Sequence, residues 1–448
     1  MRFVALAIIL ASLPIFIGLL REHPHRRGWA MMAIGFLLFC GNDLRVNASI
    51  IGWPLWNGIS KGIDVSFVDT LAIALLVTRR RLPGRMPFWG VLGFYGFALF
   101  LSLLASTVPM ASFFMCWQFC RMALLFAAAV GEFQRDDMRK GLLTGLSLGL
   151  MLQAVYVIQQ KAHGVVQATG TMSHQNVLGM MTELALLPLM AALLTGDRRK
   201  VLVAGIVAAL IVIAGGGSRG AMSIAGGGAV LLMILSLCQR VTPIKLKVVG
   251  FAVLALVVAA PLAMITLKDR FGSTSITTQD DQRPAFERAA RAMAADHPFG
   301  VGANMYVPTA NTKGYADRAG VAWNFANRSA PVHNAYLLSR AEAGWLGELA
   351  LILMLVVPLI RGLRLAFTSR AVGREFILGS VVALGVNVIH NNFEFAGLEY
   401  NPFMLLAVNI AIIAAAVRAN ARQGRGVPKS ARRRNDGEQS ATGTLRQV

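Results

Sequence analysis

Residues 3–20, FVALAIILASLPIFIGLL, contain no charged side chain. A helix of about 20 mostly apolar residues crosses the hydrocarbon core of a bilayer, so this stretch predicts a membrane span. Its position resembles that of a signal peptide, but it lacks a small-x-small cleavage site and is followed directly by Arg21, Arg26 and Arg27. We therefore expect it to remain in the protein as a span.

Comparable apolar stretches recur along the chain. Of its 448 residues, 56% are hydrophobic and only 15% are charged, which excludes an ordinary soluble domain. Backbone polar groups find no water inside a bilayer, so these stretches must be helical, and the alternating pattern of a barrel strand is absent. The predicted fold class is an all-α polytopic membrane protein with about 12–13 transmembrane helices. The spans are expected near residues 3–20, 29–39, 65–77, 88–105, 113–130, 142–158, 177–194, 202–214, 222–238, 248–267, 335–359, 376–389 and 403–417.

The basic residues give the predicted bundle a direction, because they fall in every second loop and Lys and Arg mark cytoplasmic loops. We expect residues 1–417 to form one transmembrane domain and the basic tail, residues 418–448, to lie in the cytoplasm. The long polar insert, residues 268–332, then lies on the periplasmic face. The basic loop residues are Arg79, Arg80, Arg81, Arg139, Lys140, Arg198, Arg199, Lys200, Arg240, Lys245, Lys247, Arg361, Arg364 and Arg418.

The tail carries Arg432, Arg433 and Arg434 among Gly, Ser, Gln and Asn, a composition typical of disorder. Although the net charge is +21, this distribution favours attraction to anionic lipid over nucleic-acid binding. The orientation of the N-terminus has two solutions. Strict alternation places Met1 outside, whereas a re-entrant segment at residues 29–39 would place it inside.

The four cysteines lie in or beside apolar spans. We interpret Cys40, Cys116, Cys120 and Cys238 as small membrane-helix residues rather than as disulfides or metal ligands.

A short outer loop, residues 215–220 with the sequence GGGSRG, could receive an anion. Its glycines allow backbone N–H groups to approach a ligand, and Arg219, beside Ser218, carries a planar charged fork suited to phosphate. No Gly-Lys-Ser/Thr follows, so this is not a Walker motif. The glycines alone favour the other interpretation, a tight interhelical turn.

Within the insert, Asp280 to Pro284 begins a predicted surface helix with acidic residues and Pro at its start. Phe286, Ala289, Ala290 and Met293 share one face, whereas Arg288 and Arg291 lie on another. A helix N-terminus and Arg283 together favour an anion. Arg288 is the alternative phosphate ligand, and either arginine could be only a solvated charge. The following glycines, Gly300 and Gly302, suit a turn.

His333 and Asn334 end the insert and open the next span. The spacing of His333, Leu337, Arg340 and Gly344 predicts one shared helical face. Histidine is a common proton acceptor and donor, so His333 could serve as a base for a hydroxyl or a donor to a phosphate or sugar. A helix cap or interfacial anchor is the bland alternative for a lone His. Arg340 and Glu342 could be partners that make burial tolerable.

Two further polar clusters lie at the outer ends of spans. Asn387, His390, Asn391 and Glu394 form one stripe at helical spacing, and His174, Asn176 and Glu183 surround another span. Amides and carboxylates of this kind line sugar sites, or else bond neighbouring helices. The histidines are scattered over different loops and no HExxH or paired Cys spacing occurs, so no metal site is predicted.

Taken in order, these motifs resemble the O-antigen ligase and Wzy-type polysaccharide polymerase family. The resemblance covers residues 170–359. Its motifs are Gly170-Thr171, His174-Gln175-Asn176, Ser218-Arg219-Gly220-Ala221, Arg283, His297-Pro298 with Gly300-Val301-Gly302, and His333-Asn334 with Leu337, Glu342 and Gly344.

The resemblance implies a membrane glycosyltransferase of the bacterial inner membrane with its active site facing the periplasm. Such an enzyme moves a glycan from an undecaprenyl-diphosphate carrier to an acceptor hydroxyl of a glycan, lipid or protein, with inversion and without a metal or other cofactor. Carried over by motif, Arg219 and Arg283 hold the donor diphosphate and His333 is the essential His. Ser218, Asn334, Arg288, His174, Asn176, Glu342, His390 and Glu394 are the candidate substrate-binding residues.

Two alternatives remain open at this point. A repeat-unit polymerase would use a second carrier-linked glycan as acceptor, and nothing in the sequence marks the acceptor. A flippase or transporter of polyprenyl-linked glycans would require paired mid-membrane charges in repeat-related helices, whereas the polar residues here gather on one face.

Overall fold

The computed structural model describes residues 2–41, 44, 46–79, 86–250, 252–253, 282–368 and 374–426. The first part of the polar insert, most of the predicted span at 248–267 and the tail from residue 427 lie outside the described residues.

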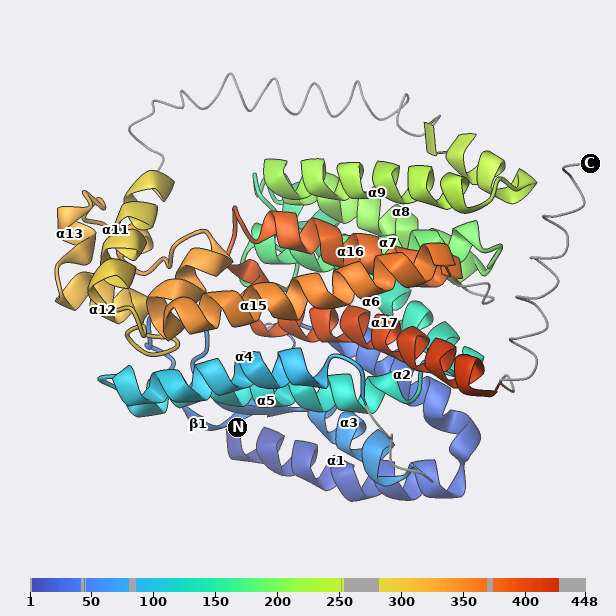
Figure 1. Cartoon of the computed structure of the whole chain (residues 1–448), viewed down its shortest axis with the longest axis horizontal. Helices are drawn as coiled ribbons and strands as arrows, with labels where there is room; N and C mark the ends of the chain where they lie inside the picture. Colours follow the sequence, from blue (N-terminus) through green and yellow to red (C-terminus); the bar gives the residue numbers. More distant parts are fainter. Residues whose placement is uncertain are drawn as a thin grey trace, which may run out of the picture.

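Apolar helices run side by side through the molecule, which is a polytopic membrane protein (Figure 1). In the described part, seven helices are long and apolar enough to cross a membrane, and four shorter apolar helices accompany them. The seven are α1 (Arg2–Glu22), α5 (Pro109–Val130), α6 (Asp136–Ala162), α7 (Gln175–Leu194), α9 (Arg219–Gln239), α15 (Ala335–Thr368) and α17 (Tyr400–Gly426). The four are α3 (Phe67–Val77), α4 (Trp89–Ser102) extended by η3 (Leu103–Ala105), α8 (Lys200–Gly216) and α16 (Arg374–His390).

The predicted segment at residues 29–39 forms a helix of half the length that a span needs. It is α2 (Arg27–Leu37), which follows η1 (Pro24–Arg26) and packs against α6. The two backbones touch, because a Cβ on Gly141 would overlap the carbonyl oxygen of Gly28 and one on Gly145 would overlap that of Met32. Small residues that let helix backbones approach closely stabilise helix pairs in membranes.

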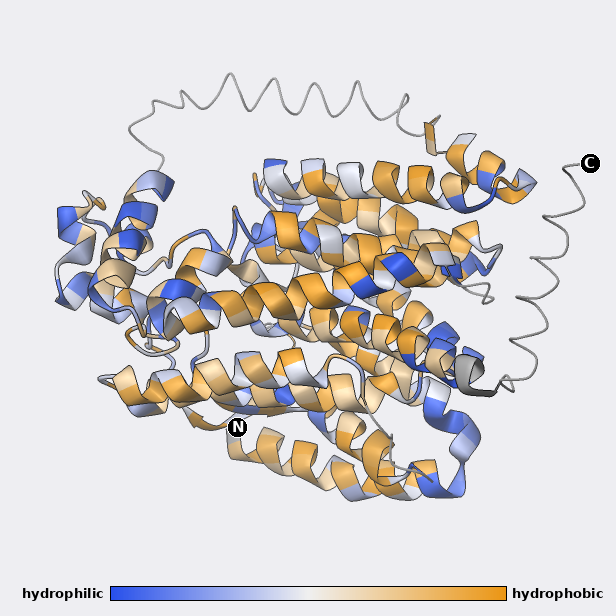
Figure 2. Cartoon of the chain, in the orientation of Figure 1, coloured by the Kyte–Doolittle hydropathy of each residue, from blue (hydrophilic) through white to orange (hydrophobic). Residues whose placement is uncertain are grey.

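The two ends of the bundle differ in chemistry. The described part of the insert gathers at one end, which we call the insert end, and α17 finishes at the other, the tail end (Figure 1). Polar residues concentrate at both ends and apolar residues between them (Figure 2). α1 begins toward the insert end and finishes at the tail end (Figure 1). This placement agrees with the strict-alternation solution for the N-terminus.

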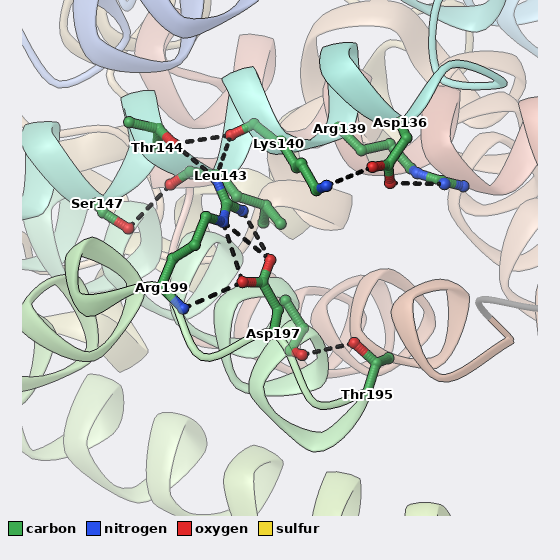
Figure 3. Close-up of polar contacts among 10 residues, drawn as sticks. Asp136, Arg139, Lys140, Leu143, Thr144, Ser147, Thr195, Asp197 and Arg199 are labelled. Carbon is green, nitrogen blue, oxygen red and sulfur yellow. Dashed lines mark hydrogen bonds and ion pairs between the residues drawn. The ribbon is translucent and has the colours of Figure 1, made fainter.

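Basic residues of the tail end are engaged with the loops there. Arg199 pairs with Asp197 at 2.8 Å and donates to the Lys140 carbonyl oxygen at 3.0 Å and to Thr144 Oγ1 at 2.9 Å (Figure 3). These contacts tie the α7–α8 loop to the start of α6. Deeper in, Arg27 pairs with buried Glu132 at 2.6 Å.

A β-hairpin at the insert end was not predicted from the sequence. Strands β1 (Asn47–Gly52) and β2 (Gly62–Ser66) pair antiparallel, with a register irregularity between Ser49 and Ile51. Ser66 then caps α3 through a capping box with Asp69. The hairpin loop bonds to the insert, because Asn304 Nδ2 donates to the Ser60 carbonyl oxygen at 2.7 Å.

The insert is docked on a break in α15. The chain leaves helical geometry at Gly344 (φ 70°, ψ −172°), which frees carbonyl oxygens in the preceding turn. Val301 N donates to the Ala341 oxygen at 3.1 Å, and Gly302 N donates to the Glu342 oxygen at 2.9 Å. The sequence spacing predicted that Arg340 and Gly344 share one helical face. Because the helix breaks at Gly344, this prediction is wrong at that residue.

The described insert consists of short helices: α11 (Arg283–Asp296), α12 (Tyr306–Thr312), α13 (Tyr315–Arg318) and α14 (Phe325–Arg328). As predicted, Phe286, Ala289, Ala290 and Met293 of α11 are buried together. The fold is completed by η4 (Ala396–Leu398) between α16 and α17.

We expect Gly300→Ala to undock the insert. Gly300 has φ +83°, which costs an L-residue about 1–2 kcal/mol, and an added Cβ would overlap the Glu342 carbonyl oxygen. Limited proteolysis of the purified protein should therefore cleave the insert faster in this variant.

Gly320→Ala is the matched control, because Gly320 has φ +74° but its nearest neighbouring atom lies 4.0 Å from the added Cβ. Equal cleavage rates for the two variants would show that contact with the broken turn of α15 does not hold the insert.

Candidate functional site

The carboxylate of Glu394 joins three segments at the insert end. Glu394 follows α16, and its side chain is only 5% exposed. Oε1 accepts from Arg283 of α11 at 3.0 Å and from the side-chain amide of Asn176 at the start of α7, while Oε2 lies 3.0 Å from His333 Nδ1. Residues far apart in sequence therefore meet around one buried negative charge.

His333 lies between two aromatic rings. Its ring centroid is 6.0 Å from that of Phe286 on α11, with the two rings tilted. It is 5.4 Å from that of Phe395, and these two rings meet edge to face. The side chain keeps 21% of its surface exposed. A carboxylate accepts a hydrogen from Nδ1, which leaves Nε2 as the nitrogen with a lone pair for a ligand.

Arg283 is the first residue of α11, followed by Pro284. Its guanidinium reaches Glu394, yet the side chain remains 49% exposed. The position combines a permanent positive charge with the N-terminus of a 14-residue helix, both of which favour an anion.

The predicted anion loop lies beside this cluster. Gly217 adopts a left-handed conformation (φ 62°) that ends α8, and Ser218 caps α9 by accepting from Ala221 N at 3.4 Å. A Cβ on Gly220 would lie 4.0 Å from His390 Nε2. Arg219 is exposed in the first turn of α9. This turn lies close to the end of α16, the helix that precedes Glu394.

His174 and Asn176 open α7 on the same side. The His174 side chain caps the helix by accepting from Asn176 N at 3.2 Å. Burial lowers the pKa of His174, and the charges of His333 and Arg283 act in the same direction while Glu394 opposes them. His174 is therefore part of the same electrostatic cluster.

His390 and Glu183 form a fully buried pair between α16 and α7, with Nδ1 and Oε1 2.9 Å apart. His390 lies one helical turn before Glu394 in the chain, and the Glu394 N–H donates to the His390 carbonyl oxygen at 3.1 Å. Glu183 thus bonds the neighbouring helix, which is one of the two interpretations that the sequence left open for its cluster. Asn391 belongs to this frame too, since its carbonyl oxygen accepts from Ala335 N at 2.8 Å.

Glu342, Asn334 and Arg288 make hydrogen bonds to groups other than the Glu394 carboxylate. Both oxygens of Glu342 accept backbone N–H groups of the insert, from Asn304 at 2.8 Å and Tyr306 at 3.0 Å. Asn334 Oδ1 accepts from Leu337 N at 2.9 Å, in the first turn of α15. Arg288 donates to the Ala319 carbonyl oxygen at 2.8 Å inside the insert. The predicted pairing of Arg340 with Glu342 is replaced by an ion pair of Arg340 with Glu348 at 3.5 Å.

A cavity of about 370 Å³ is lined in part by Phe395, whose ring contacts His333, and was missed in the sequence. It lies between the hairpin, α5 and the start of α17, and includes Phe395, Ser173 and Glu399. Ser173 Oγ donates to Glu399 Oε2 at 2.8 Å. Ser173 and Glu399 lie close in sequence to His174 and Glu394, which is a signal that could have identified them as site residues. No such signal marks the hairpin residues that form the rest of the cavity wall.

The cluster offers the Arg283 guanidinium, a helix N-terminus and a carboxylate-oriented imidazole, and Arg219 lies in the neighbouring first turn of α9. This set can hold an anionic group and accept a proton from a hydroxyl. Among the described residues, no group of three or more His, Cys, Asp and Glu is arranged to hold a metal ion. Fold and site together describe a polytopic membrane protein with a cluster of charged and imidazole side chains at one end of its bundle.

Residues 204–352 match the family model described as O-antigen ligase, so the chain carries an O-antigen ligase domain. The match lies within the range 170–359 outlined by the motifs and includes Arg219, Arg283 and His333. It supports a membrane enzyme of the ligase or polymerase type in surface polysaccharide assembly. No curated protein matches the chain.

Proposed function

We propose that this protein is an inverting glycosyltransferase that moves a glycan from undecaprenyl diphosphate to an acceptor hydroxyl. The observation that carries the proposal is the shared partner of Arg283 and His333: one buried carboxylate, Glu394, contacts both within 3.0 Å. An anion-binding charge and a proton acceptor held side by side are what transfer from a diphosphate to a hydroxyl requires.

The diphosphate would be held by Arg283 and Arg219. A glycosyl diphosphate gains negative charge on its bridging oxygen as the glycosidic bond breaks, and fixed guanidinium groups stabilise that charge. Arg283 is preferred over Arg288 because it reaches Glu394, whereas Arg288 donates to the Ala319 carbonyl oxygen. Arg219 directly precedes Gly220, where an added Cβ would lie 4.0 Å from His390 Nε2.

His333 would act on the acceptor. Glu394 fixes the Nδ1–H tautomer, so Nε2 can accept the hydroxyl proton, as carboxylates orient imidazoles in hydrolytic triads. The acceptor oxygen forms a bond to the anomeric carbon while the bond from that carbon to the diphosphate oxygen breaks. The electron pair leaves with undecaprenyl diphosphate, the proton moves to His333, and the anomeric configuration inverts. No metal or nucleotide cofactor takes part.

The domain match leaves ligase and polymerase as the two subclasses. We propose the ligase, which delivers a finished glycan to a lipid, glycan or protein acceptor in the bacterial inner membrane, with the insert end facing the periplasm. The basic residues at the tail end support this orientation. Polymerisation of carrier-linked repeat units is the second candidate.

We expect Arg219→Ala, Arg283→Ala, His333→Ala and Glu394→Gln each to lower glycan transfer. Loss of a positioned acid–base group or of its orienting carboxylate costs roughly 10²- to 10⁴-fold. Loss of a fixed charge on the leaving group costs roughly 10²- to 10³-fold. Transfer would be measured as glycan ladders from cells that contain equal amounts of membrane-inserted protein.

Two arginines on the same helix serve as controls. Arg291 is exposed and pairs with Glu287 at 3.2 Å, so Arg291→Ala should leave the ladders intact. Arg288→Ala should retain most transfer. Normal ladders in the Arg283 and His333 variants, or loss of transfer only in the Arg288 variant, would remove the proposed assignment.

The carrier lipids of a deletion strain test the choice between the subclasses. A ligase acts after polymerisation, so we expect full-length polymer to accumulate on undecaprenyl diphosphate, as measured by mass spectrometry of extracted lipids. Accumulation of single repeat units would instead assign the polymerase.

The proposed orientation predicts the labelling of an exposed insert position. Thr312 lies at the end of α12 and is exposed. In a variant without the native cysteines, Thr312→Cys should react with a membrane-impermeant thiol reagent in cells with a permeabilised outer membrane. A cysteine at Arg422, near the opposite end, is the protected control, and the reverse pattern of labelling would overturn the orientation.

A further inference from the structure

We infer that the cavity between the hairpin and the start of α17 is the binding site for the acceptor saccharide, with Glu399 and Lys61 contacting its hydroxyl groups. This inference rests on the proposed glycan transfer and names the place of its second substrate. We call this space the hairpin cavity; its walls come from β1, β2 and their loop, from α5, from residues 172–173 and from residues 395–401.

The size of the hairpin cavity suits a small saccharide unit. Its volume is about 370 Å³, within the roughly 300–1,000 Å³ found for small-molecule sites. It is not a gap between lipid-facing helices, because the hairpin loop closes it on one side. That loop is fixed to the insert through Asn304, which bonds to both the N–H and the carbonyl oxygen of Ser60, at 3.1 and 2.7 Å.

The lining has the chemistry of a sugar site. Aromatic rings offer flat apolar faces, and amides, hydroxyls and a carboxylate offer hydrogen bonds to hydroxyl groups. Trp117 and Tyr400 lie in the wall beside Gln118 and Asn401. Trp117 is held by donation from Nε1 to the Asp64 carbonyl oxygen at 2.7 Å.

The charges of the hairpin cavity do not favour a diphosphate. Arg121 is engaged with buried Asp69 at 2.8 Å and stacks on the Tyr400 ring, 4.1 Å from its centroid. Asp64 and Glu399 contribute negative charge to the same wall, which offsets the positive charge of Lys61. The donor's anionic group is therefore expected at Arg219 and Arg283, and an uncharged polyhydroxyl group in the hairpin cavity.

The hairpin cavity is linked to the proposed base through residues that lie beside it. Phe395 lines it and contacts the His333 ring. Pro331, two residues before His333, lines it as well. A saccharide seated there would extend a hydroxyl past Phe395 toward His333, while the proposed anion-binding arginine Arg283 lies on Glu394.

Glu399 is placed to read hydroxyl groups. One of its oxygens accepts from Ser173, and it lies in the field of Lys61 from the hairpin loop. Burial raises the pKa of Glu399 to about 7, helped by the charge of Glu394 and opposed by the Ser173 hydrogen bond and Lys61. Near neutral pH the carboxyl group can accept a hydrogen bond from a sugar hydroxyl or donate one to it.

The test uses the purified full-length protein with carrier-linked glycan as donor and a carrier-free oligosaccharide, released from glycolipids of the deletion strain, as acceptor. Glu399→Gln and Lys61→Met should each raise the KM for the oligosaccharide roughly ten- to a hundredfold, the loss expected for a hydrogen bond to a charged group, with little change in kcat. Glu399→Gln preserves the side-chain shape and Lys61 is exposed, so both variants should fold. Glu287→Gln, on the outer face of α11, is the matched control.

Donor binding is followed separately by thermal stabilisation with undecaprenyl diphosphate. We expect both cavity variants to be stabilised as the unaltered protein is, and Arg283→Ala to lose stabilisation. If the cavity variants keep the normal KM for the oligosaccharide, the hairpin cavity is not the acceptor site although the proposed function stands. If undecaprenyl diphosphate fails to stabilise even the unaltered protein, the proposed function itself fails.

Discussion

The carboxylate of Glu394 is the constraint on which the insert end depends. A buried carboxylate must be compensated by positive charge or hydrogen bonds, because desolvation of an unpaired charge costs several kcal/mol. Here the compensation comes from Arg283, Asn176 and His333, which belong to three separate segments. Satisfying one charge therefore brings α7, α11 and the segment before α15 to fixed positions around the end of α16.

Glu394 could not hold Arg283 and His333 together if the insert were loosely attached. The break of α15 at Gly344 supplies the attachment, since it frees carbonyl oxygens for the backbone of the insert, and Glu342 adds two acceptors for N–H groups. The insert is thus bonded to α15 on one side and, through Asn304, to the hairpin on the other. The polar groups of Glu342 and Asn304 hold the insert in place. In this they differ from residues whose polar atoms remain available to a ligand.

Hydropathy and charge in the sequence were sufficient to predict the membrane bundle, the uneven distribution of basic residues and the amphipathic face of α11. Each of these features depends on the composition of a single helix or loop. The pairs around Glu394 could not be predicted in this way, because Arg283 lies 111 residues and His333 61 residues from it. The spacing of His333, Leu337, Arg340 and Gly344 misled for a related reason: it assumed an unbroken helix, and tertiary contacts with Gly300 stabilise the break. The hairpin was missed because its short strands carry no long periodic signal.

The charge balance of the cluster also changes during the proposed reaction in the direction that catalysis requires. Before transfer, Glu394 offsets one of the two guanidinium charges, so a diphosphate meets a modest positive field. As the acceptor proton moves to His333, the imidazole becomes cationic while the leaving diphosphate gains negative charge. The positive charge of the site therefore rises together with the charge that it must stabilise, and an interaction that strengthens in the transition state accelerates the reaction more than uniform binding would. A second arginine in the place of His333 would hold the diphosphate more strongly from the start, and its own charge would not increase as the bond breaks.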